Sequence, residues 1–154
     1  MTDNYIKMCE RATEIQDEWK KTGRSIGDKF IAYMGDNTGR GEILWTSHND
    51  YASDYDIFLP SQRQLQNMVD ENFIPTIIMG KFVNEISPEI NMQLARNSRD
   101  TDFEHAEKEA ILLNQLLDRK RYYEQFQSME ELWLAYVMHK KYNKQWNGTQ
   151  WRGL

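Results

Sequence analysis

The most constraining feature of the chain is the stretch 128–142, SMEELWLAYVMHKKY. Ser128 and Glu131 form a capping box, in which the side chain of each residue accepts a hydrogen bond from the backbone N–H of the other. Apolar residues then recur every three or four positions and also fill most of the remaining helix surface. Those on the helical spacing are Met129, Leu132, Trp133, Tyr136 and Val137. The stretch is therefore predicted to be a buried helix on which the rest of the chain packs.

Composition bounds the class of protein. The 154 residues are 40% hydrophobic and 28% charged, which is enough for one domain with its own core. Cys9 is the single cysteine, so no internal disulfide can form, and its place beside an apolar stripe favours a core role over a nucleophile. No leader-like or membrane-spanning apolar run occurs, so we expect no membrane association and a cytoplasmic location.

Residues 5–22 carry apolar side chains at helical spacing and are predicted to form one amphipathic helix that ends at Gly23. Two short β-prone runs, 28–34 and 42–47, flank the turn-forming sequence GDNTGRG and predict a hairpin, to which 57–59 could add a third strand. The turn is rich in glycine, but the sequence lacks the lysine and the following helix of a phosphate-binding loop.

Further helices are expected along the second half of the chain. Ser61 and Gln64 repeat the capping-box signal, and 102–127 has the composition and apolar spacing of a long helix. The run 73–83 is apolar but interrupted by Pro75 and Gly80, which leaves a bent helix or an extended segment open. An Asn-Gly turn between Trp146 and Trp151 could staple the C-terminus to the body.

The predicted fold is a predominantly helical α+β single domain, 1–154, with a small two- or three-stranded antiparallel sheet. The predicted core combines residues from both ends of the chain. Its members are Met8, Ala12, Ile15, Trp19, Phe30, Leu65, Leu113, Leu132, Trp133, Tyr136 and Val137.

A cluster of hard ligands follows the hairpin. His48, Asp50, Asp54 and Asp56 lie within nine residues and could hold Mg²⁺, Mn²⁺ or Ca²⁺, which would suit a metal-dependent phosphodiester or nucleotide hydrolase. The spacing matches no calcium-binding loop, and a polar loop rich in Asp, Asn and Ser is the commonest connector between strands. A solvated loop is therefore the favoured interpretation, and the metal site is the alternative.

Basic and aromatic residues interleave in 118–123 and 139–146. This pattern occurs on surfaces that bind single-stranded nucleic acid, and the candidate contacts are Arg119, Arg121, Lys140 and Lys141. Cations at helix C-termini, with aromatic rings folded onto the core, give the same pattern and are favoured. The net charge of −5 also disfavours nonspecific binding to phosphate backbones.

Three separated segments carry a family resemblance. Residues 5–19 (YIKMCERATEIQDEW), 58–68 (FLPSQRQLQNM) and 128–151 (SMEELWLAYVMHKKYNKQWNGTQW) are similar in order and type to small proteins encoded by bacteriophages and prophages, largely of Firmicutes. The resemblance implies a phage origin and action in the host cytoplasm, and it transfers no site residue. Between 71 and 117 the chain departs from the family pattern, which predicts a family-specific helical insertion at about 72–117.

No catalytic constellation stands out in the sequence, so a binding role is favoured over an enzyme, and no cofactor is expected. We therefore expect a phage-encoded accessory protein that binds a host or phage protein, with inhibition of a host defence system as one form of this role. Interfaces favour aromatic residues, and the expected exposed partner-binding residues are Tyr51, Tyr55, Trp146 and Trp151.

Overall fold

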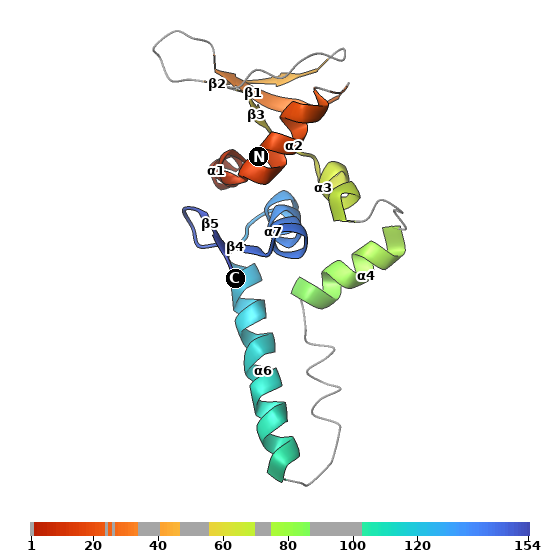
Figure 1. The fold of residues 1–154 in the computed structure, drawn as a ribbon, viewed down its shortest axis with the longest axis vertical. Coiled ribbons are helices and arrows are strands. Elements are labelled where there is room, and N and C mark those ends of the chain that lie inside the picture. The colour runs from red at the N-terminus through yellow and green to blue at the C-terminus, as the bar shows by residue number, and fades with distance from the viewer. Residues whose placement is uncertain are drawn as a thin grey trace. The chain divides into compact units, whose positions relative to one another are not determined.

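The protein is predominantly helical and of the α+β class, with one three-stranded antiparallel sheet and one two-stranded sheet (Figure 1). The computed structural model describes residues 2–23, 25, 27–33, 41–46, 56–69, 75–86 and 103–154. This class agrees with the prediction from sequence.

The chain divides into two compact units. Unit 1 combines Met1–Glu71 with Ser128–Leu154, and unit 2 is Asn72–Gln127. Unit 2 thus contains residues 72–117, for which the sequence predicts an insertion. That this stretch is an insertion into a family fold stays a prediction.

Helix α7, Met129–Tyr142, lies at the centre of unit 1, as its sequence predicts. Ser128 caps its start by accepting a hydrogen bond from the Glu131 N–H at 3.2 Å. The side chains of Trp133, Tyr136 and Val137 are fully buried, and the helix contacts helices α1 and α3. The Glu131 carboxylate is itself buried and accepts a hydrogen bond from the Thr2 hydroxyl, so the starts of α1 and α7 are tied together.

The predicted single helix over 5–22 is wrong in one respect. It is two helices, α1 (Asp3–Arg11) and α2 (Thr13–Thr22), which meet at Ala12 with a non-helical backbone (φ −83°, ψ 67°). The break frees the Cys9 carbonyl from regular helix bonding, and the buried Gln16 side chain bonds this carbonyl at 2.9 Å. The helix ends at Gly23 (φ 77°), as expected.

The main sheet has the strand order β2-β1-β3. Strand β1 (Lys29–Tyr33) pairs antiparallel with β2 (Gly41–Trp45) and with β3 (Ile57–Phe58), which confirms the predicted hairpin and third strand. On one face of the sheet Phe30 and Phe58 lie side by side, and both contact Trp19 of α2. The Trp19 indole stacks on the Phe58 ring, with 4.9 Å between the ring centroids. Strand β2 lies on the far side of β1 from β3 (Figure 1).

Two local signals in the sequence have the predicted structure. Ser61 and Gln64 form a complete capping box at helix α3 (Gln62–Val69), with Ser61 N donating to Gln64 Oε1 at 2.7 Å and Gln64 N donating to Ser61 Oγ at 3.3 Å. The C-terminal tail forms a hairpin of β4 (Lys144–Trp146) and β5 (Trp151–Gly153). The Asn147 side chain holds the turn by accepting from the N–H groups of Thr149 and Gln150.

Unit 2 contains helices α4 (Pro75–Ile86) and α6 (Phe103–Glu124), which contact each other. Of the two interpretations left open for 73–83, the helix is correct. Pro75 occupies its first position, where a missing N–H costs nothing, and Gly80 lies within it. The buried Glu85 carboxylate of α4 and the Arg119 guanidinium of α6 form an ion pair at 3.4 Å.

Most of the predicted core is buried. Leu113 and Leu132 are the exceptions, because each is only partly covered. The buried members are Met8, Ala12, Ile15, Trp19, Phe30, Leu65, Trp133, Tyr136 and Val137.

Candidate interaction surfaces

One edge of the main sheet is closed by a side chain. Leu59 N donates to Lys29 O at 2.7 Å, so these two residues form a hydrogen-bonded pair between β3 and β1. Hydrogen-bonded and non-hydrogen-bonded pairs alternate along an antiparallel ladder, so the backbone N–H and C=O of Phe58, the next residue, point away from β1. The buried amide of Gln16 bonds both of them: Phe58 N donates to Gln16 Oε1 at 2.8 Å, and Gln16 Nε2 donates to Phe58 O at 3.0 Å. Gln16 therefore takes the place of a further strand beside β3.

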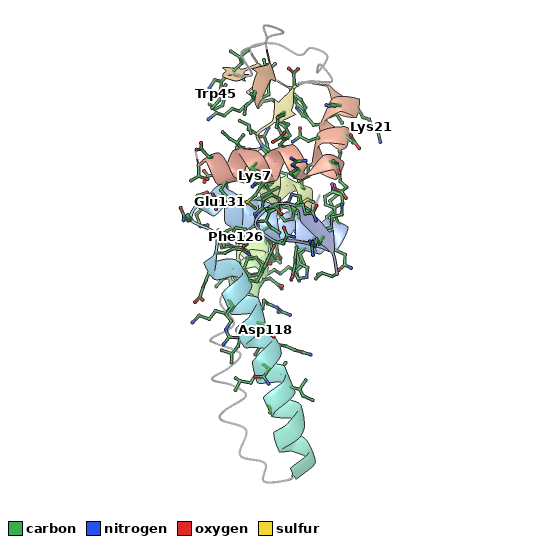
Figure 2. All side chains as sticks on the ribbon, turned by 90° about the vertical axis from the view of Figure 1, so that its left-hand side faces the viewer. Lys7, Lys21, Trp45, Asp118, Phe126 and Glu131 are labelled. Carbon is green, nitrogen blue, oxygen red and sulfur yellow. The ribbon has the colours of Figure 1, made fainter. Side chains whose placement is uncertain are left out.

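The opposite edge, strand β2, exposes three consecutive apolar residues. Ile43, Leu44 and Trp45 all have exposed side chains, and Trp45 is the most open of them at 66% (Figure 2). The Lys29 ammonium lies over the Trp45 ring at 5.1 Å. Apolar exposure of this kind on an edge strand is typical of a surface that pairs with another chain.

A buried carboxylate joins three elements of unit 1. Asp28 Oδ2 accepts from Trp19 Nε1 at 2.7 Å and from Ser25 N at 2.8 Å, and Asp28 Oδ1 accepts from Gln64 Nε2 at 2.7 Å. These bonds connect α2, the start of β1 and α3 beside an open cavity of about 220 Å³. Three neutral donors satisfy the carboxylate, so its role is to fix these elements.

Unit 2 also exposes apolar side chains, on both of its helices. Ile111 and Leu112, adjacent on α6, are 53% and 47% exposed. On α4 the side chains of Ile77, Met79 and Val83 are exposed as well, although α4 buries Ile78 and Phe82. These five exposed residues are called the unit 2 apolar surface below.

The structure corrects two of the predicted partner-binding residues. Trp146 and Trp151 are buried, with only 3% and 8% of their surfaces exposed. Their rings contact each other, with 5.1 Å between the ring centroids. Trp151 Nε1 donates to the Met8 carbonyl at 3.0 Å, so the pair fastens the C-terminal hairpin to α1. The other two candidates, Tyr51 and Tyr55, lie outside the described residues.

Of the alternative metal ligands, His48, Asp50 and Asp54 also lie outside the described residues. Asp56 is described and is buried at the start of β3. Within the described ranges, no group of three or more His, Cys, Asp or Glu side chains is arranged to hold a metal ion. The metal site stays an untested alternative.

The four candidate nucleic-acid contacts fall in different units. Arg119 and Arg121 belong to unit 2, where Arg119 pairs with Glu85 and Arg121 with Asp118 at 3.6 Å. Lys140 and Lys141 belong to unit 1. Lys141 donates to Glu18 at 2.8 Å, and Lys140 lies over the Tyr136 ring at 5.9 Å. Arg119, Arg121 and Lys141 are thus paired with carboxylates, which weakens their attraction for phosphate.

Cys9 has the structural role predicted for it. It is buried within α1, and desolvation by burial raises the pKa of its thiol, which keeps the thiol protonated and unreactive. Burial likewise raises the pKa of the neighbouring Tyr5 hydroxyl, which donates a hydrogen bond to the Pro60 carbonyl. Both residues therefore belong to the core.

Comparisons of the chain with protein-family models, with curated proteins and with solved structures find no match. The resemblance to phage proteins accordingly stays a prediction. Within the part of the chain that the structure describes, no helix has the length and apolarity needed to cross a bilayer.

Sequence reasoning missed the two exposed apolar surfaces. The signal for the surface on β2 was present in the sequence, since Ile43, Leu44 and Trp45 are consecutive. Successive side chains of a strand point to opposite faces of the sheet, so one buried face cannot cover all three. The signal for the second was the width of the apolar stripe on α6, which Ile111 and Leu112 extend.

Proposed function

We propose that the protein is a phage-encoded accessory protein that acts in the bacterial host cytoplasm by binding a host or phage protein. A component of a host defence system is the target class to test first. The proposal includes no catalytic step and no cofactor.

The observation that carries the proposal is the unit 2 apolar surface. Ile111 and Leu112 are adjacent and half exposed, and burying the exposed half of one such side chain in an interface contributes about 1 kcal/mol. Exposed apolar groups on both helices of a small unit are typical of surfaces that bind another protein. The phage resemblance of the rest of the chain supplies the biological setting.

The test is a tagged pull-down from host lysate, run with and without nuclease and read by quantitative mass spectrometry. We expect one protein, retained in stoichiometric amount, whose recovery is unchanged by nuclease. A double variant, Ile111→Ser with Leu112→Ser, should lower its retention about tenfold or more, because two apolar contacts are lost.

The matched control is Met129→Ser in α7. Met129 is 42% exposed and lies in unit 1, so its loss should leave retention unchanged. Retention of nothing would contradict the proposal and favour the metal site of the loop 48–56. Retention of nuclease-sensitive material alone would contradict it as well and favour the basic, aromatic segments. Equal loss in the control and the double variant would show that the unit 2 apolar surface is not the binding site.

A further inference from the structure

The two edges of the main sheet differ in how their backbone groups are satisfied. At β3 the outward N–H and C=O of Phe58 are both bonded by Gln16. At β2, Thr46 N donates to Asp28 O at 2.9 Å, so Asp28 and Thr46 form a hydrogen-bonded pair. Hydrogen-bonded pairs recur at every second position of an antiparallel ladder, so Phe30 and Leu44 form the next such pair. The backbone groups of Ile43 and Trp45 then point away from β1, and none of the described residues bonds them.

An open edge strand pairs readily with another strand unless its residues oppose pairing. Natural edges are usually protected by lysine, proline, a bulge or very short length. Strand β2 has five residues, no proline and no lysine, and three of its residues are consecutive apolar ones with exposed side chains. Its composition thus favours pairing.

The strand is also complementary to itself. In an antiparallel pairing centred on Ile43, all five residues overlap, and the outward-facing positions form the hydrogen-bonded pairs. Ile43 then lies opposite Ile43 of a second copy, and each Trp45 lies opposite Gly41 of the other copy. Glycine has no side chain there, so the large indole can cover its backbone, a known way to stabilise glycine in a sheet.

The charge distribution agrees with this register. Glu42, the one charged residue of the strand, lies opposite Leu44 of the second copy, so no two like charges face each other. The sheet would continue in the order β3-β1-β2 and then β2-β1-β3 of the second copy. Both of its outer edges would be β3 edges, which Gln16 closes, so the assembly would end at two chains.

We propose that β2 is a self-association site, through which two copies of this chain form a symmetric antiparallel dimer centred on Ile43. The proposal is independent of the function assigned to unit 2, because it concerns a different surface. A strand from another protein is the competing occupant of the same edge.

The register can be tested by disulfide cross-linking. In a hydrogen-bonded pair the Cα atoms are about 5.5 Å apart, within the range that a disulfide spans, so Ile43→Cys should form a covalent dimer under mild oxidation. The control is Leu44→Cys. Position 44 would lie opposite position 42 of the second copy, so the two Cα atoms of position 44 would be diagonal neighbours, about 7–8 Å apart, and should remain mostly uncross-linked. The native Cys9 is buried and does not interfere.

Sedimentation of the unmodified chain across a concentration series supplies the second measurement. We expect the mass to shift from 18.4 kDa toward twice that value, and Trp45→Lys to abolish the shift. Leu154→Lys, at another exposed apolar residue of unit 1, should still dimerise. A monomer at every concentration, or equal cross-linking of the two cysteine variants, would overturn the proposal and leave the edge to a different partner.

Discussion

The Gln16 side chain bonds Phe58 through both of that residue's backbone groups, 42 positions away in the sequence, and in this way imitates a neighbouring strand. The same amide also donates to the Cys9 carbonyl at the junction of α1 and α2. One buried side chain therefore fixes the angle between two helices and closes a sheet edge.

Replacing Gln16 with Ala should destabilise the protein by about 2–4 kcal/mol. The substitution leaves the buried N–H and C=O of Phe58 without their partner, and it removes one of the two hydrogen bonds to the Cys9 carbonyl, which keeps its bond from Ala12 N. Each buried backbone group without a partner costs about 1–3 kcal/mol, partly relieved by entering water. Chemical denaturation monitored by tryptophan fluorescence would measure the loss. Gln115→Ala, at an exposed position of α6, should change stability by less than about 0.5 kcal/mol. A similar result for both variants would show that the bonds of Gln16 contribute little.

Trp133→Ala should cost about 3–5 kcal/mol, because it removes the largest fully buried side chain in the protein's described core. Its ring also contacts Tyr136 edge to face at 5.6 Å, a geometry that adds to the burial energy. The midpoint of thermal unfolding is the simplest measurement. A variant that melts as the native protein does would contradict the central role of α7.

The Glu18 carboxylate should make stability depend on pH on the acid side. Its hydrogen bonds from Lys141 and then from the Tyr142 hydroxyl hold its pKa below the ordinary value. A lowered folded-state pKa gives stability that is present above the unfolded pKa of about 4.3 and is lost as pH falls through the folded value.

Glu18→Gln should therefore reduce stability at pH 7 and flatten its decline as the pH falls below about 4.3. The effect should stay below about 1 kcal/mol, since the side chain is half exposed and solvent screens the pair. Denaturation midpoints at several pH values would measure the slope. A slope equal to that of the native protein would show that Glu18 does not contribute.

Cys9 should react slowly with thiol reagents while the chain is folded. Burial raises the pKa of its thiol and blocks access, so labelling requires that α1 open. The labelling rate at neutral pH should rise steeply in denaturant, in step with loss of tryptophan fluorescence. Rapid labelling under native conditions would show that α1 detaches from unit 1 independently.

Local signals in the sequence predicted much of the fold. The capping box of Ser61 and the N-cap of Ser128 each depend on residues three positions apart, so both helix starts follow from the sequence alone. The break at Ala12 was not predictable in this way, because it depends on a bond from the Gln16 side chain to the Cys9 carbonyl. Gln16 is in turn bonded to Phe58 of a strand that is distant in sequence.

The candidate surfaces were harder to predict. Aromatic residues favour both cores and interfaces, so their type alone did not distinguish the buried Trp146 and Trp151 from the exposed Trp45. The distinction depends on the tertiary partner: Trp151 meets the Met8 carbonyl of α1, whereas Trp45 lies on an edge strand. Neither relationship is encoded by neighbours in sequence.

The division of unit 1 into two stretches of sequence has a consequence for synthesis on the ribosome. Helix α7 and the hairpin of β4 and β5 come from Ser128–Leu154, which is made after unit 2. Residues 1–71 therefore emerge before the helix that completes their core, so the apolar faces of α1 and α2 stay uncovered while the whole of unit 2 emerges and can begin to fold. During that interval the nascent chain is a natural client for a chaperone.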